Sequence, residues 1–93
     1  MKNNIKTKYV YLVGERGMQG ESILHVCQSY PTAYLRWNEI RKALIDFFEG
    51  LYEATSLKKF GNAIEKLQCK DPDQLHNFPY LEPFINKKQV NED

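Results

Sequence analysis

The chain lacks three features that would place it in a specialised class: an excess of charge of one sign, more than a few cysteines, and a long hydrophobic run. Its 93 residues include 13 Lys and Arg against 12 Asp and Glu, a formal net charge of +1. Binding to nucleic-acid phosphates depends on a broad basic excess, so this balance disfavours nucleic acid as a partner. The longest apolar run, residues 9–13, is too short for a signal peptide or a transmembrane helix. We therefore expect a cytoplasmic protein with no membrane partner.

The scarcity of cysteine and histidine limits the chemistry. Cys27 and Cys69 are far apart in the sequence, and we expect free thiols rather than a disulfide. With His25 and His76 they make the inventory of a structural zinc site, but the spacings His-x-Cys and Cys-x6-His fit no standard zinc module. His25 and Cys27 share one face of a predicted strand, yet catalysis by a nucleophile also needs an orienting group and an oxyanion site. We expect no metal, no cofactor and no enzymatic activity.

The composition is that of one ordinary globular domain. Hydrophobic residues make up 42% of the chain, aromatic residues 13% and charged residues 27%, which excludes disordered, collagen-like and disulfide-scaffold proteins. A length of 93 residues leaves no room for a second core of ordinary size. We place the domain at residues 1–85, followed by a polar, disordered tail at residues 86–93.

The N-terminal part predicts a β-hairpin over residues 8–29. Residues 8–13 and 22–28 are rich in β-branched and aromatic residues, as strands are. Glycines at every third position between them match neither a dinucleotide-binding fingerprint nor a P-loop. We therefore expect a long, mobile hairpin tip at residues 14–21.

Two helices and an extended arm are predicted after the hairpin. A helix over residues 31–53 follows Ser29, a good N-cap residue, although Gly50 could end it. A shorter helix covers residues 56–69, and an arm carrying two prolines covers residues 78–85. The predicted fold class is α+β: an N-terminal antiparallel β-hairpin packed on a long amphipathic helix, then a shorter helix and an extended C-terminal arm.

The hairpin-to-helix junction resembles one known group of proteins. Within residues 9–33 the chain reads Tyr-Val-Tyr-Leu-Val, then Gly-Glu-Ser-Ile-Leu-His-Val, then Ser-Tyr-Pro-Thr-Ala. This resembles small uncharacterised proteins, often encoded by phages and mobile elements, in which a hairpin with a Gly/Glu-rich tip precedes a capped helix. Cys27 departs from them, since they more often have an aromatic residue there. The resemblance implies a fold element and a genetic context, but no activity.

The long helix predicts a possible protein-binding surface. Its apolar residues form two neighbouring stripes, and a two-stranded hairpin can cover only one of them. Either the C-terminal arm packs back over the second stripe, or another chain, a protein partner or a second copy, covers it. In the second case the partner-binding residues on the helix are Tyr34, Ile45, Phe48 and Tyr52. Arg16 and Met18 at the hairpin tip are further candidate partner contacts.

We therefore predict a small, non-enzymatic protein–protein interaction protein that binds a partner or dimerises through an aromatic helix face. The alternative is a nucleic-acid-binding accessory protein that uses the basic side of the second helix. The residues for this alternative are Lys59, Lys66 and Lys70, which lie close together on a helical wheel.

Overall fold

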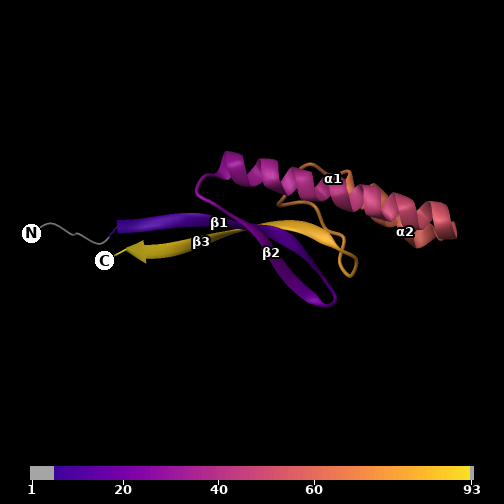
Figure 1. The fold of residues 1–93 in the computed structure, drawn as a ribbon, viewed down its shortest axis with the longest axis horizontal. Coiled ribbons are helices and arrows are strands. Elements are labelled where there is room, and N and C mark those ends of the chain that lie inside the picture. The colour runs from indigo at the N-terminus through magenta and orange to yellow at the C-terminus, as the bar shows by residue number, and fades with distance from the viewer. Residues whose placement is uncertain (1–5, 93) are drawn as a thin grey trace, which may run out of the picture.

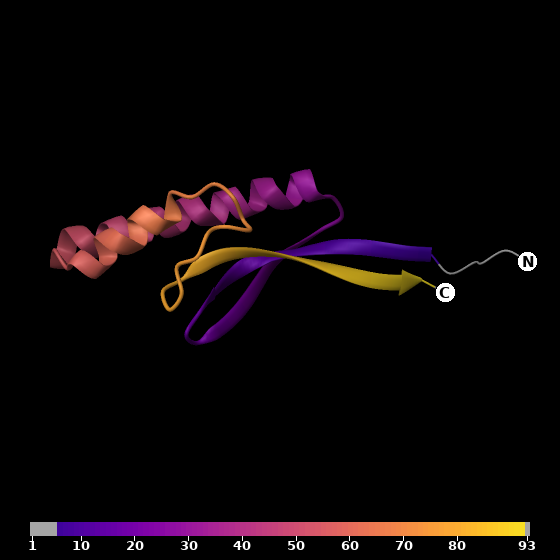
Figure 2. The ribbon, with the colours of Figure 1, turned by 180° about the vertical axis from the view of Figure 1, so that it is seen from behind.

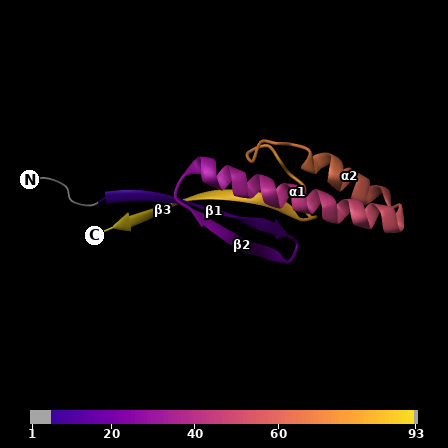
Figure 3. The same cartoon turned by 45° about the horizontal axis from the view of Figure 1, so that its top comes forward.

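A computed structural model describes residues 6–92, which form a three-stranded antiparallel sheet and two helices (Figure 1). The elements are β1 (Lys6–Gly17), β2 (Gly20–Cys27), α1 (Tyr30–Thr55), α2 (Lys58–Leu67) and β3 (Glu82–Glu92). The strand order is β2-β1-β3, so β1 is central and the other two strands are edges. Both helices lie on the same side of the sheet (Figures 1 and 3). The predicted α+β fold class is confirmed.

The hairpin between β1 and β2 is tighter than the sequence predicted. Gly17 pairs with Gly20, so only Met18 and Gln19 form the turn. Gly20 has φ 115°, a backbone conformation that glycine adopts without steric cost and that often closes such turns. The expected long, mobile tip at residues 14–21 is therefore wrong, because the strands continue almost to the end of the hairpin.

A β-bulge interrupts the pairing near the middle of β2. After His25 the next paired residue is Ile23, opposite Gly14, which leaves Leu24 as the extra residue. A Cβ at Gly14 would lie 1.9 Å from a backbone oxygen of β2, so only glycine fits there. In a regular strand, alternation of side chains would place Ile23 on the same face as Cys27. The bulge breaks that alternation, and Ile23 is 52% exposed while Cys27 is buried.

The C-terminal segment forms the third strand. β3 pairs with β1 from Glu82 opposite Arg16 to Glu92 opposite Lys6. The expected disorder of residues 86–93 is wrong for residues 86–92, while residue 93 lies outside the described residues. Polar composition suggested a frayed tail, but β1 is longer than β2 and offers its free edge as a backbone partner. The paired ends of β1 and β3 extend beyond the helices as a ribbon (Figure 1), and the molecule is 66 Å long.

The helices are bounded by local capping signals. The Ser29 side chain accepts a hydrogen bond from the backbone amide of Thr32, at 3.4 Å, at the start of α1. At the other end the amide of Ser56, in the left-handed region at φ 58°, donates to the carbonyl of Tyr52. α1 is two residues longer than predicted at its C-terminus and continues through Gly50, while α2 is shorter than predicted.

The core lies between the sheet and the two helices. Its buried hydrophobic residues are Val13, Cys27, Ala33, Trp37, Ile40, Leu44, Phe48, Ala63, Leu67 and Leu75. α2 runs back along the C-terminal half of α1 (Figure 3). The segment between α2 and β3, residues 68–81, then returns past α1 to the start of β3 (Figure 2). The second apolar stripe of α1 is thus covered in part by its own chain, although Tyr52 stays 45% exposed.

Candidate functional site

The aromatic helix face predicted as a partner surface is not an open face. Phe48 is 3% exposed, because the rings of Phe60 in α2 and Tyr80 in the following segment pack against it, each with a centroid separation of 6.1 Å. Of the two alternatives left open for this stripe, the packing of the C-terminal arm over it is the one observed at Phe48, so Phe48 is not available as a partner contact. Sequence periodicity placed Phe48 correctly on α1, but it could not decide whether the arm over 30 residues later or another chain covers it.

The other three residues of that face are held by neighbours to different degrees. Tyr34 stacks on Trp37 at 5.5 Å, and its hydroxyl donates to the carbonyl of Lys70 at 2.7 Å. Ile45 is half-buried against the core, whereas Tyr52 is 45% exposed. The four residues therefore form no continuous exposed surface on α1.

The hairpin-tip residues differ from each other. The Nε of Arg16 donates to Glu82 at 3.0 Å, and its guanidinium lies 5.2 Å from the ring centroid of Phe84. Met18 is 77% exposed. Arg16 therefore has a structural role, whereas Met18 lies on a surface that a partner can reach.

The lysines of the nucleic-acid alternative lie on or just after α2. Lys59, Lys66 and Lys70 are all exposed. The ammonium of Lys59 lies 5.2 Å from the ring centroid of Phe60. These lysines are separate from the groove described next, since none of them lines it.

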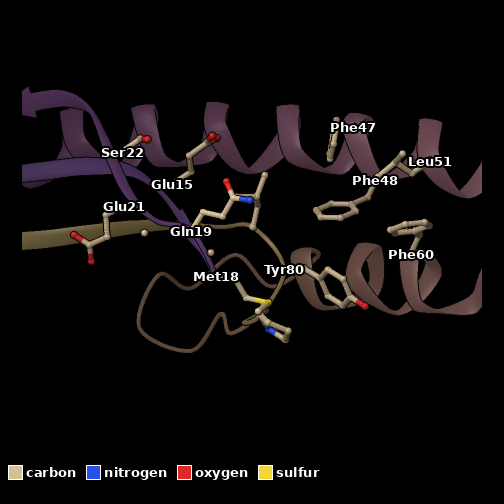
Figure 4. Close-up of a pocket in the computed structure, with 14 residues that line it drawn as sticks. Glu15, Met18, Gln19, Glu21, Ser22, Phe47, Phe48, Leu51, Phe60 and Tyr80 are labelled. Carbon is tan, nitrogen blue, oxygen red and sulfur yellow. The ribbon is translucent and has the colours of Figure 1, made fainter.

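A groove opens where the hairpin tip diverges from the two helices (Figure 4). Its volume is about 580 Å³. The apolar lining comes from α1, α2 and the segment before β3: Phe47, Phe48, Leu51, Phe60, Tyr80 and Leu81. Unlike its neighbour in the sequence, Phe47 is 52% exposed. The divergence of the hairpin tip leaves Phe47 uncovered.

The hairpin side of the groove is polar and acidic. Glu15, Gln19, Glu21 and Ser22 line it, and the lining contains no Lys, Arg or His. A carboxylate oxygen of Glu21 lies 4.0 Å from a guanidinium nitrogen of Arg16, so part of its charge is balanced. The register places Glu15 and Glu21 on opposite faces of the hairpin, so Glu15 supplies the negative charge on the face toward α1. An aromatic wall beside this carboxylate favours an apolar group next to a cation.

A buried carboxylate secures one wall of the groove. The Glu82 side chain is 2% exposed and receives two hydrogen bonds: from Arg16 Nε at 3.0 Å and from the backbone amide of Asn77 at 2.6 Å. The Asn77 side-chain amide donates to the carbonyl of Leu81 at 3.0 Å. Charge-assisted bonds of this kind offset the cost of burying the carboxylate. They hold the turn that presents Pro79 and other lining residues against the hairpin.

The described residues offer little for covalent or metal chemistry. Cys27 is a buried free thiol and Cys69 a half-buried one. No group of three or more His, Cys, Asp or Glu among the described residues is placed to hold a metal ion. Burial, followed by the charges of Asp73 and Asp71, raises the pKa of Tyr30 above its ordinary value, so this phenol remains protonated at neutral pH.

Within residues 6–92, no helix has the length and hydrophobicity needed to cross a lipid bilayer. Comparisons with known proteins found no matching family model, no matching curated protein and no matching solved structure.

Proposed function

We propose that this chain is a non-enzymatic protein-interaction domain that takes an apolar side chain of a partner protein into the groove between the hairpin tip and the helices. The observation that carries this proposal is the position of Phe47. This phenylalanine is 52% exposed at the edge of an aromatic-walled groove, while the adjacent Phe48 is buried. A groove of about 580 Å³ is within the size range of ligand sites in proteins.

The composition of the groove supports a protein partner. Protein interfaces typically have an aromatic and methionine-rich centre with a polar rim. Here the aromatic wall meets Met18, a flexible side chain that is 77% exposed and can adapt to different partner surfaces. Glu15 favours a partner that carries a cation near its apolar group.

The proposal keeps the class of partner predicted from the sequence and changes the contact surface. Met18 remains a partner contact, and the surface moves from the face of α1 containing Tyr34 and Ile45 to the groove beside Phe47. Given the resemblance of residues 9–33, the proposal includes a phage or mobile-element genetic context.

A selection from displayed peptides tests this function. The bait is the full chain, and the probe is a library of random peptides of eight residues, the length of β2. We expect enrichment of peptides that share one large apolar residue. Phe47→Ser is expected to weaken their binding by about tenfold or more, because a half-exposed aromatic residue at an interface is a typical energetic anchor.

Leu35→Ser is the matched control for that experiment. Leu35 lies on the same helix, is 63% exposed and does not line the groove. Binding should therefore be unchanged in this variant. Failure to enrich any peptide, or equal losses in both variants, would contradict the proposed function.

A further inference from the structure

The two edges of the sheet differ in how well they are protected against pairing with another strand. β3 carries Pro83, which has no amide to donate, and the charged pair Lys87 and Lys88. β2 has no proline and no lysine, and Glu21 is its single charged residue. Edge strands normally carry such protective residues, because an unpaired strand edge is a template for association. The β2 edge is therefore the one open to an additional strand.

The exposed side chains of β2 add to this contrast. Ile23, Leu24 and Val26 are between 51% and 63% exposed. An eight-residue edge strand with three exposed aliphatic residues is unusual for a protein surface in contact with water alone. The bulge at Leu24 interrupts the regular ladder, so an added strand would pair most regularly with residues 20–23.

That first part of β2 also borders the groove. Gly20, Glu21 and Ser22 line it on the hairpin side, and Phe47 and Leu51 of α1 line it on the opposite side (Figure 4). A strand added beside residues 20–23 would therefore have one face toward α1. Because successive side chains of a strand point to opposite faces, every second side chain of that strand would point toward the groove.

We propose that the groove binds an extended peptide that adds to the β2 edge as a fourth strand and inserts one large apolar side chain between β2 and α1. This inference rests on the proposed function and specifies the class of partner. Main-chain hydrogen bonds to β2 supply affinity, and the groove selects the inserted side chain. A Lys or Arg two positions from the inserted residue lies on the same face of the peptide, the face toward Glu15.

The test uses the peptides enriched by the selection described above, with sequence and backbone changed separately. We expect enriched sequences to carry Lys or Arg two positions from the apolar residue. In the best of them, replacing the apolar residue by Ala should weaken binding about tenfold or more. N-methylation of a backbone amide that pairs with β2 should weaken binding about tenfold, while N-methylation of its neighbour, which points away, should have little effect.

NMR of the labelled full chain supplies the structural readout. Bound peptide should slow amide hydrogen exchange in β2 residues 20–23 and produce cross-strand contacts to them, with no such change in β3. Ile23→Lys lies within the segment that pairs with the peptide, does not alter the groove lining, and tests the edge. A charge on this exposed β2 position is expected to weaken binding, whereas Val90→Lys on β3 is not.

The outcomes separate the two proposals. Peptides that lose binding with Phe47→Ser but tolerate N-methylation at every position would overturn strand addition and leave the groove function intact. Enrichment of no peptide would overturn both. If the chain instead forms dimers in sedimentation experiments and dimerisation is abolished by Ile23→Lys, the strand that covers β2 belongs to a second copy, and the peptide proposal is overturned.

Discussion

The two halves of α1 are packed very differently, although both are amphipathic. In the N-terminal half, Trp37 is completely buried, and the side chain of Arg41 beside it is held by a 2.8 Å hydrogen bond to the carbonyl of Leu67. In the C-terminal half, Phe47 is half-exposed beside the groove. The N-terminal half lies over the centre of the sheet, whereas the hairpin tip diverges from the C-terminal half (Figure 1). Apolar periodicity alone therefore does not distinguish a core surface from a binding surface.

The largest expected effect on stability comes from a substitution in the N-terminal half of α1. Trp37→Ala should lower the free energy of unfolding by about 3–5 kcal/mol, because it leaves a cavity under a side chain with no exposed surface. Trp37→Phe should lower it by about 1–2 kcal/mol, since it leaves a smaller cavity and removes a buried indole N–H that has no hydrogen-bond partner among residues 6–92. Urea denaturation followed by circular dichroism measures both. Equal losses of free energy of unfolding in the two variants would show that cavity size does not determine the contribution of Trp37 to stability.

A second prediction compares two ion pairs of nearly equal length in different surroundings. Arg16–Glu82 spans 3.0 Å with Glu82 buried, and Arg36–Glu39 spans 3.1 Å with both side chains largely exposed. Glu82→Ala should cost about 2–3 kcal/mol, because it leaves the Asn77 amide without its acceptor and breaks a pair that is buried on one side.

Glu39→Ala is the matched control for the ion-pair comparison. It should cost about 0.5 kcal/mol or less, because water screens an exposed pair. Urea denaturation at low and high salt provides the measurement, and only the Glu39 variant should approach the wild-type stability as salt rises. If Glu82→Ala and Glu39→Ala lower the free energy of unfolding equally, burial does not set the strength of these ion pairs.

At the groove, two substitutions are expected to have similar and small effects on stability. Phe47→Ser and Leu35→Ser remove similarly exposed side chains from the same helix, and each should change the free energy of unfolding by about 0.5–1 kcal/mol at most. Only Phe47→Ser should weaken peptide binding. A stability loss of several kcal/mol in Phe47→Ser would place Phe47 in the core and remove the support for a binding surface.

Local sequence signals predicted most of the elements and only part of the site. The strand–strand–helix–helix order, the cap at Ser29 and the α+β class follow from periodicity and capping, which act over a few residues. The third strand was not predicted, because residues 86–92 are polar and their pairing with β1 involves residues about 80 positions away. For the same reason the sequence placed Met18 at an exposed hairpin tip but could not show that Phe48 is covered or that Phe47 is not.

The sequence by itself therefore determined the helices, the hairpin, the absence of charge excess and the positions of the aromatic residues along α1. Only the tertiary structure decided which of these aromatic residues are buried, which sheet edge is unprotected, and that Arg16 and Glu82, 66 residues apart, form the contact beside the groove. The physical reason is that helix and turn formation depend on neighbours within one or two turns of the chain. A groove depends on the relative placement of segments that are distant in sequence, and local composition does not specify that placement.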